Sequence, residues 1–386
     1  MKDKGVIVTG HPYAYPYYFK VFTFVDKAKF IFVLPKIWRA RLVIKLEKIA
    51  GFKIYGLNAL SYGRQSFFGG QFKGWLPGIL WLLPYLRLRY QPRVLYSCSE
   101  PNLLTTLFNG LVAKCFGLRY AIFTWQNIPA ENRLHGIKLR LSLFLVRLNL
   151  WLADGVICGN KKAELIVKQL NKTIKTAIFP LSGVDVERFK PGLVSDWKQR
   201  LNLFDHKTIL FYGALDKRKG LNILLDAFKI VQDQSSKLVV VGRGPEAEKL
   251  KQQTSLLGLG GRVIFIDWMD NAKLPELLNT ADIFVYPSVP VGGWEEQFGY
   301  AMAEASACAL PVISTQTGSI AEVVLNEKTG ILVEPNNSTA LALALDKLLA
   351  DRALREGWGH CGRDYVVENY SHKKIAEQLT NFLFNL

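Results

Sequence analysis

Two glutamates, Glu296 and Glu304, stand with seven residues between them, and Gly299 lies in that interval. Gly299 opens an apolar run that predicts a helix, and the first backbone N–H groups of a helix lack partners within it, so they can hold an anion. Glu304 would lie five residues into this helix, about 7.5 Å along its axis. Carboxylates accept hydrogen bonds from hydroxyl groups. The spacing therefore fits a ligand with a phosphate between two hydroxyl-rich groups, as in a nucleotide sugar.

The same two glutamates could instead lie on the solvent-exposed face of a helix. Their neighbours argue against that alternative, because Phe298, Met302 and Cys308 leave little room for a polar stripe. Pro311 stands where such a helix would have to stop before the next strand. We therefore favour a binding role for both carboxylates.

Short apolar runs alternate with helical stretches along the whole chain, which predicts an α/β fold with parallel sheets covered on both faces. A length of 386 residues suits two domains. We expect helices at 102–116 and 138–152, the second buried against a sheet. The expected strands fall at 6–9, 30–34, 53–57, 94–96, 120–123 and 155–158, and then at 208–211, 237–241, 262–266, 283–286, 312–314 and 331–333.

Several motifs resemble those of family 4 retaining glycosyltransferases. Besides the glutamate segment, they are Phe-Tyr-Gly-Ala-Leu at 211–215 with Lys219-Gly220, Gly-Arg-Gly-Pro at 242–245, Tyr-Pro-Ser at 286–288, and Gly318-Ser319 with Glu322. The resemblance is specific over about residues 150–386 and loose before that. It implies the GT-B fold, in which two Rossmann-like doubly wound parallel-sheet domains face a cleft.

This resemblance sets the expected domain boundaries. The first, acceptor-binding domain would span residues 1–183, and residues 184–207 would form a linker and the start of the second lobe. A donor-binding domain would follow at 208–364. A C-terminal helix at 365–386 would then cross back to the first domain.

The resemblance also implies an activity: transfer of a hexose from a UDP- or GDP-sugar with retention of configuration, without a metal ion or a cofactor. Departing diphosphate must be neutralised, and fixed N–H dipoles and cations can do this. The family commonly has Gly-Arg where this chain has Gly213-Ala214, so Arg218 is the candidate substitute. The residues assigned to the donor are Gly213, Arg218, Lys219, Arg243, Trp268, Met269, Glu296, Phe298, Gly299, Tyr300 and Glu304.

Within this set the expected roles differ. Lys219 would contact the diphosphate, Glu296 the transferred sugar, and Glu304 the ribose. Trp268 and Met269 follow a predicted strand where the family reads the base. Arg243 either faces the donor or is simply solvated.

The first domain offers fewer signals. After the strand that ends in Phe123-Thr124, many relatives carry a histidine, whereas this chain has Gln126 and Asn127. Both amides could hydrogen-bond a sugar, and we count them with Glu296 and Lys219 as candidate catalytic residues. The candidate acceptor-binding residues are His11, Tyr13, Tyr15 and Glu100, although a loop rich in proline and tyrosine can also be merely stiff.

The positive charge is concentrated in the first half of the chain. Residues 1–190 contain 29 Lys and Arg against 9 Asp and Glu, a net charge of +20, in a protein of net charge +17. Residues 35–49 predict a basic amphipathic stretch, and the apolar run 75–88 is too short to span a bilayer. Together they favour an anionic membrane surface as a partner. Alternatively, the apolar residues of 35–49 pack a Rossmann helix.

The expected partners are therefore a nucleotide sugar, a lipid-linked or membrane-held glycan acceptor, and an anionic membrane. Nucleic acid is not expected, because no base-reading or stacking motif accompanies the charge. Five cysteines without a Cys-x-x-Cys pair favour reduced thiols, and no metal site is suggested. We expect a cytoplasmic protein attached to the inner face of the membrane. Two alternatives stay open: a soluble acidic or phosphorylated sugar acceptor, and a catalytically inactive GT-B-fold binding protein.

Overall fold

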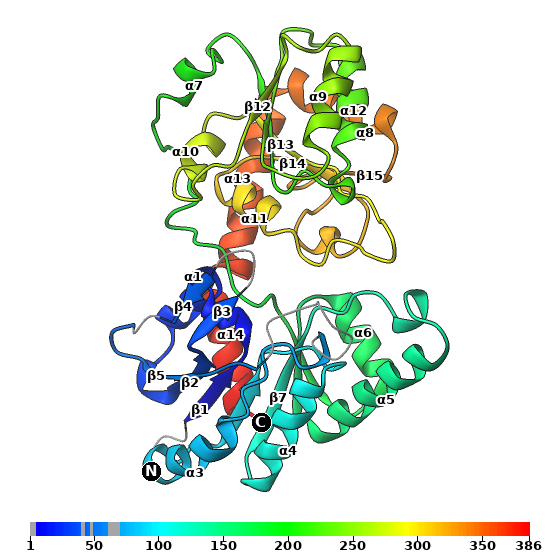
Figure 1. Ribbon diagram of the computed structural model, residues 1–386. Coiled ribbons are helices and arrows are strands. Elements are labelled where there is room, and N and C mark those ends of the chain that lie inside the picture. Colours follow the sequence, from blue (N-terminus) through cyan, green and yellow to red (C-terminus); the bar gives the residue numbers. More distant parts are fainter. Residues whose placement is uncertain (1–4, 40–42, 47–48, 61–69) are drawn as a thin grey trace. The chain divides into compact units, whose positions relative to one another are not determined.

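The chain forms two compact units (Figure 1). The computed structural model describes residues 5–39, 43–46, 49–60 and 70–386. One unit consists of Met1–Gly183 together with His372–Leu386, and the other of Val184–Ser371. Each unit has a parallel sheet of its own.

The first unit contains a seven-stranded sheet in the order β5-β2-β1-β6-β7-β8-β9. Every neighbouring pair is parallel, as expected for apolar strands buried on both faces. Its last strand, β9, was not expected from the sequence, because it is short and only partly buried. The strands are β1 (Val6–Thr9), β2 (Phe30–Pro35), β5 (Lys53–Leu57), β6 (Val94–Ser97), β7 (Arg119–Thr124), β8 (Gly155–Cys158) and β9 (Lys175–Ile178).

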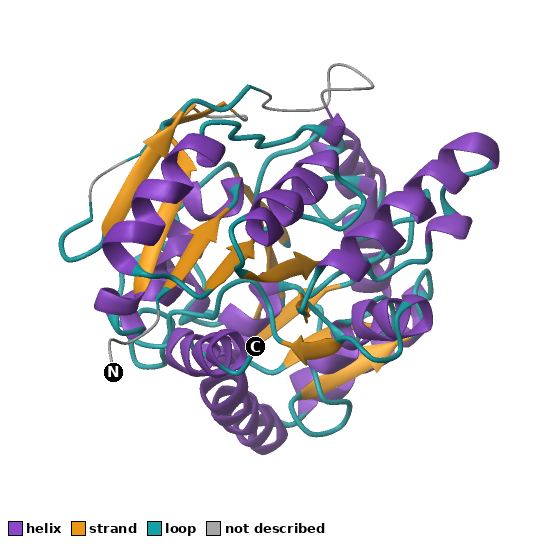
Figure 2. Ribbon diagram, turned by 90° about the horizontal axis from the view of Figure 1, so that it is seen from below, coloured by secondary structure: helices purple, strands orange, loops and turns teal. Residues whose placement is uncertain are grey.

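Helices cover both faces of this sheet. Figure 2 shows them in purple on either side of the orange strands near the N label. One face carries α3 (Ile79–Tyr90), α4 (Leu104–Cys115), α5 (Gly136–Leu152) and α6 (Lys161–Leu170), which share one apolar core with the sheet. The successive connections from β5 to β9 all lead across the sheet in the same direction. Because such crossovers are right-handed, they place these helices on the same face of the sheet. The other face packs against α1 (Pro16–Phe19) and α14 (His372–Phe384), through Phe19 on Phe32 and Phe384 on Phe30.

The basic stretch at 35–49 is not a helix, which corrects the expectation of an amphipathic one. Its described parts form an antiparallel pair, β3 (Ile37–Arg39) with β4 (Val43–Lys45), in which Trp38 lies opposite Ile44. Side chains of β3 alternate between exposed and buried, as expected for a strand with one buried face. Trp38 is buried and its neighbours in β3 are exposed. Residues 40–42 and 47–48 of this stretch lie outside the described residues.

The apolar run at 75–88 contributes most of α3, which has Pro84 inside it. Among the described residues, no helix is both long enough and apolar enough to cross a bilayer.

The second unit contains a six-stranded parallel sheet in the order β12-β11-β10-β13-β14-β15. All six strands lie where the sequence predicts them, since each is a buried apolar run that ends at glycine, proline or polar residues. They are β10 (Thr208–Tyr212), β11 (Lys237–Val241), β12 (Val263–Ile266), β13 (Ile283–Tyr286), β14 (Val312–Thr315) and β15 (Gly330–Val333).

The helices of the second unit pack in two groups. On one side α8 (Leu221–Ile230) contacts α9 (Ala247–Leu256) and α12 (Ser338–Ala350), and elsewhere α11 (Tyr300–Ala307) contacts α13 (Arg352–Tyr370). The short helices α7 (Trp197–Arg200) and α10 (Leu274–Leu278) complete the unit.

The second unit extends beyond the boundaries expected for the donor domain. Residues 184–207 belong to it, with Phe189 fully buried, and α13 continues to Tyr370. The chain turns at Ser371, and α14 then belongs to the first unit, where His372 Nδ1 lies 3.2 Å from Ser182 Oγ.

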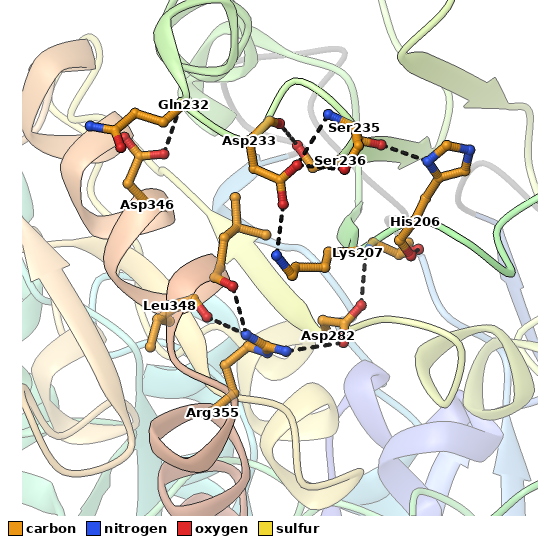
Figure 3. Close-up of polar contacts among 12 residues, drawn as sticks. His206, Lys207, Gln232, Asp233, Ser235, Ser236, Asp282, Asp346, Leu348 and Arg355 are labelled. Carbon is orange, nitrogen blue, oxygen red and sulfur yellow. Dashed lines mark hydrogen bonds and ion pairs between the residues drawn. The ribbon is translucent and has the colours of Figure 1, made fainter.

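The amino ends of the strands in the second sheet are closed by a polar network (Figure 3). The backbone N–H of Thr208 donates to Asp282 Oδ2 at 2.8 Å, and Lys207 pairs with Asp233 at 2.9 Å. Hydrogen bonds from Lys207 and Ser235 lower the pKa of Asp233 to about 2. Arg355 adds a hydrogen bond to the carbonyl of Leu348 at 2.6 Å. This edge is therefore occupied by structural contacts, and ligands of such sheets bind at the opposite, carboxyl edge.

Candidate functional site

Four loops meet at the carboxyl edge of the second sheet, after β10, β11, β13 and β14. Glycines allow the loops after β10 and β11 to touch. A Cβ atom on Gly242 would lie 1.9 Å from the carbonyl oxygen of Gly213, and a Cβ atom on Gly244 would lie 2.2 Å from the carbonyl oxygen of Leu215. Two backbone hydrogen bonds fix the contact, from Leu215 N to Arg243 O and from Glu246 N to Leu215 O. The loop motifs recognised in the sequence thus form one rigid rim.

Lys219 and Glu296 form an ion pair in this rim, with Lys219 Nζ 2.7 Å from Glu296 Oε2. Both side chains are nearly buried. Two aromatic rings enclose the ammonium group, with centroids 4.6 Å (Tyr286) and 5.2 Å (Trp294) from Nζ. The sequence indicated each charged residue separately, but neither their pairing nor this aromatic surround.

The loop after β14 holds the backbone of Glu296. Gly318 has a φ of 59°, and a Cβ there would lie 2.0 Å from the carbonyl oxygen of Glu296. That oxygen accepts a hydrogen bond from Ser319 N at 2.9 Å. Within the described part of the chain, the buried hydroxyl of Ser319 has no hydrogen-bond partner. A buried hydroxyl without a partner is costly, so it is available to a polar ligand. The sequence indicated Ser319 only as part of a motif.

Gly299 sets the start of α11 beside this pair. Its φ of 85° is in the left-handed region, and a Cβ there would lie 2.0 Å from Met302 Cε. Helix α11 begins at the next residue, Tyr300, so its positive N-terminal end lies four residues along the chain from Glu296. The Phe298 ring packs against Tyr300 and Tyr370. What Phe298 can offer a ligand is therefore its backbone and not its ring.

Glu304 faces into the unit and not the solvent. It is 5 % exposed and Glu296 is 8 % exposed, so the alternative of two solvated glutamates is wrong. The Tyr212 hydroxyl, at the end of β10, contacts the Glu304 carboxylate and lies 3.4 Å from the carbonyl oxygen of Ala301. The carboxylate is thus held in place at the sheet edge, and Tyr212 is a site residue that the sequence indicated only as part of a motif.

The other predicted donor residues lie around the rim. Arg218 is fixed by Asp216, with Nε 3.1 Å from Oδ1 and Nη2 2.5 Å from Oδ2, and these contacts raise the pKa of Arg218. Its guanidinium also lies 4.4 Å from the centroid of the Trp294 ring. Arg218 therefore supplies a positioned cation close to Lys219, although it does not extend free into solvent.

Arg243, Trp268 and Met269 lie after β11 and β12. Arg243 pairs with Asp267, Nη2 to Oδ2 at 2.8 Å, and both side chains are largely exposed. Trp268 is 66 % exposed and Met269 is partly buried. The exposed indole could stack on a flat ring, whereas Arg243 is engaged by its neighbour.

In the first unit, Glu100 lies at the carboxyl ends of β6 and β7. Its carboxylate accepts hydrogen bonds from Thr124 Oγ1 at 2.7 Å and from Trp125 N at 2.9 Å. Burial raises the pKa of Glu100, against the opposing effect of these hydrogen bonds and of the charges on Lys73 and Arg133. Glu100 thus orders the chain that leads into Gln126 and Asn127, where Asn127 is buried and Gln126 partly buried.

The aromatic loop after β1 splits into packed and accessible residues. Tyr13 is buried, with its hydroxyl 3.1 Å from that of Tyr96, so the structure gives it a packing role. Tyr15 accepts a hydrogen bond from Trp38 Nε1 at 3.2 Å. His11 is partly buried and stacks on Trp38 with 4.5 Å between ring centroids. Burial and the nearby charge of Lys73 lower the pKa of His11 to about 3.

Across the described ranges, no three His, Cys, Asp or Glu side chains come together as metal ligands would.

Residues 195–365 match the family model described as Glycosyl transferases group 1. This match lies within the second unit and includes the whole rim. The chain is 32 % identical over 208 residues to an uncharacterized glycosyltransferase of Methanocaldococcus jannaschii, MJ1607, covering 52 % of each chain. It is 30 % identical over 207 residues to the GDP-mannose-dependent alpha-(1-6)-phosphatidylinositol monomannoside mannosyltransferase of Mycolicibacterium smegmatis, covering 52 % of this chain and 54 % of the relative.

The chain spans about half the length of the curated relatives it matches most strongly. Its fold extends over the whole length of solved structures, such as Anabaena Alr3699/HepE in complex with UDP, with a TM-score of 0.76 at 17 % identity, covering 99 % of this chain and 100 % of the other. Such a likeness shows the fold: the two Rossmann-like units are those of the GT-B fold.

Proposed function

We propose that this protein is a metal-independent, retaining glycosyltransferase that moves a hexose from a UDP- or GDP-sugar to a lipid-linked or otherwise membrane-held glycan. The observation that carries the proposal is the buried Lys219–Glu296 pair beside the start of α11, with Glu304 held at the same edge. A cation, a helix N-terminus and two buried carboxylates within one rim match the parts of a nucleotide sugar.

The charges suggest how the reaction is assisted. Negative charge accumulates on the diphosphate as the sugar leaves, and preorganised cations and N–H dipoles stabilise it most where water is scarce. We infer that Lys219 and the α11 N-terminus perform that task, with Arg218 near them. The bound diphosphate would compete with Glu296 for the Lys219 ammonium, which leaves the carboxylate able to accept hydrogen bonds from sugar hydroxyls. Glu304 would accept from the ribose, and the Ser319 hydroxyl would gain a partner.

Retention follows from the family resemblance. In that mechanism the acceptor hydroxyl attacks on the face of the leaving group, and the donor phosphate takes its proton. Gln126 and Asn127 would then orient the sugar without titrating. The named substrates of the Mycolicibacterium relative support a GDP-sugar and a lipid acceptor, and the UDP complex of the Anabaena protein supports uridine as the other candidate base. We place the protein in the cytoplasm, at the inner face of the membrane.

The test is release of nucleoside diphosphate from UDP- and GDP-sugars, with membrane lipid extract as the acceptor source. We expect one donor to turn over, and Glu296→Gln to lower kcat/KM by about 10²-fold or more, the effect of removing one preorganised polar contact. Asp233→Asn, at the opposite edge of the same sheet, is the control and should leave the rate unchanged. If soluble sugar phosphates replace the extract, the acceptor is soluble. If no donor turns over, the alternative of an inactive binding protein holds.

A further inference from the structure

Helix α5 presents an apolar stripe to solvent along its whole length. Ile137 is 80 %, Phe144 61 % and Trp151 76 % exposed, and Leu141 is half exposed between them. These residues recur at intervals of four, three and seven, so they share one face of the helix. The sequence predicted burial for this helix, and its opposite face, with Val146 and Leu150, is indeed buried in the core of the first unit. The outer stripe is therefore additional to the core.

The charged residues on α5 itself are all positive. Lys138, Arg140 and Arg147 are exposed on α5, and α3, α4 and α5 contain no acidic residue. The elements that contact α5 on its other sides contain one acidic residue each: Glu131, exposed in the short helix before α5, and Glu164 in α6, which accepts a hydrogen bond from Thr176. Asp154, just after α5, is engaged by Lys114 and Arg119 at 2.6 and 2.8 Å. A helix with an exposed apolar stripe and only cations among its own charged residues has the composition of a helix that lies in the surface of an anionic membrane.

Helix α3 repeats the pattern on the same face of the sheet. Trp81 and Leu88 are strongly exposed, and Arg87 and Arg89 flank Leu88. Helices α3 and α5 pack their inner sides into the same core, so their outer sides belong to one layer. Tryptophan side chains are enriched at the membrane–water interface, at the level of the lipid headgroups, so an exposed Trp81 suits such a surface.

We propose that the outer face of the α3–α5 layer, with the α5 stripe as its main apolar element, binds the headgroup region of an anionic phospholipid leaflet. A second copy of the chain is the other possible occupant, because the stripe also has the spacing of a helix–helix interface. A two-fold pairing of α5 would, however, bring three cations from each copy together with no acidic partner on either helix, which is unfavourable. Phospholipid phosphates complement the same cations, so the leaflet is favoured.

This inference rests on the proposed membrane-held acceptor for its purpose, but its test needs neither donor nor acceptor. Cosedimentation with phosphatidylglycerol vesicles is measured for the full chain and for Phe144→Ser/Trp151→Ser. We expect the wild type to bind and the variant to bind on the order of tenfold or more weakly, the factor that a loss of 1.4 kcal/mol represents. Binding should weaken from low salt to ~0.15 M salt and be poor on phosphatidylcholine.

Two matched controls make the result specific. Leu256→Ser and Leu343→Ser remove exposed leucines from α9 and α12 of the second unit and should bind as the wild type. Val43→Ser removes an exposed residue of the β3–β4 hairpin, which the sequence had favoured as the membrane contact, and should also be neutral. A loss of binding with Val43→Ser but not with the α5 variant would overturn the proposal.

Measuring the oligomeric state of the protein tests the other possible occupant of the stripe, a second copy of the chain. If the wild type sediments as a dimer, does not bind vesicles, and becomes a monomer on Phe144→Ser/Trp151→Ser, the stripe is an interface between copies and the membrane proposal is wrong. Each outcome is separate from donor turnover, so a failed vesicle assay leaves the glycosyltransferase proposal untouched, and a failed turnover assay leaves the surface assignment untouched.

Discussion

Lys219 and Glu296 neutralise each other in a setting where each side chain has about 10 % of its surface exposed. Lys219→Met would leave a nearly buried carboxylate without its partner, which costs up to about 3–5 kcal/mol of unfolding free energy in fully buried pairs. Glu296→Gln retains shape and a hydrogen-bonding group. We expect Lys219→Met to be the more destabilising single change, and the double variant to be more stable than the sum of the two losses predicts.

Urea unfolding of the four proteins of this double-mutant cycle measures the coupling. Additive losses would show that the two groups do not interact in solution and would contradict the geometry.

His11 gives the first unit a distinctive pH dependence. Its pKa of about 3 in the folded chain lies below the ordinary value of 6.5, so between these values the unfolded chain binds a proton that the folded chain does not. Stability should therefore fall as the pH falls from about 6.5 towards 3, by at most about 1.4 kcal/mol per pH unit and by less here because the ring is partly exposed. His11→Phe keeps the stack on Trp38 without the titration.

Unfolding free energies measured across that pH range should have a smaller slope in His11→Phe than in the wild type. Identical slopes would mean that His11 titrates normally. Asp233 has a pKa of about 2, so its own stabilisation is lost only as the pH falls below about 4, and the slopes are therefore compared above that pH.

At the scale of elements, two of the three glycines in α13 have opposite constraints. A Cβ at Gly357 meets no atom within 4 Å, whereas one at Gly359 would lie 2.0 Å from the carbonyl oxygen of Ala309. Gly357→Ala should stabilise the protein by about 0.5–1 kcal/mol through helix propensity. Gly359→Ala should destabilise it, because α13 must move away from the segment between α11 and β14.

Thermal unfolding of both variants tests the packing of α13. A similar stabilisation by both substitutions would contradict the close approach at Gly359.

The elements differed in how far the sequence could predict them. The strands of the second sheet are continuous apolar runs ended by residues such as Gly213, Gly242 and Pro287, and burial on both faces produces that signal directly. The stretch 35–49 has apolar residues at both helical and strand intervals, and only the burial of Trp38 decides for the hairpin. Contacts such as Tyr212 with Glu304 join residues 92 positions apart, so they depend on the folded path of the chain and not on any local pattern.

For the whole molecule, the two halves of the chain carry different charges for different tasks. Residues 1–190 have a net charge of +20, and the remaining residues have 20 Lys and Arg against 23 Asp and Glu. The candidate donor site is built entirely from the second unit, whereas the proposed membrane face belongs to the first. Donor binding and membrane binding should therefore be separable by mutation.

The most direct test of the central claim, that the rim of the second unit binds a nucleotide sugar, is thermal unfolding of the whole protein with UDP, GDP, ADP or CMP. A nucleotide at about 100 times its dissociation constant should stabilise the protein by roughly 2.7 kcal/mol. We expect UDP or GDP to raise the midpoint of the wild type and of Asp233→Ala, and to raise that of Glu304→Ala far less. No shift with any nucleotide at millimolar concentration, or an equal shift in Glu304→Ala, would contradict the account.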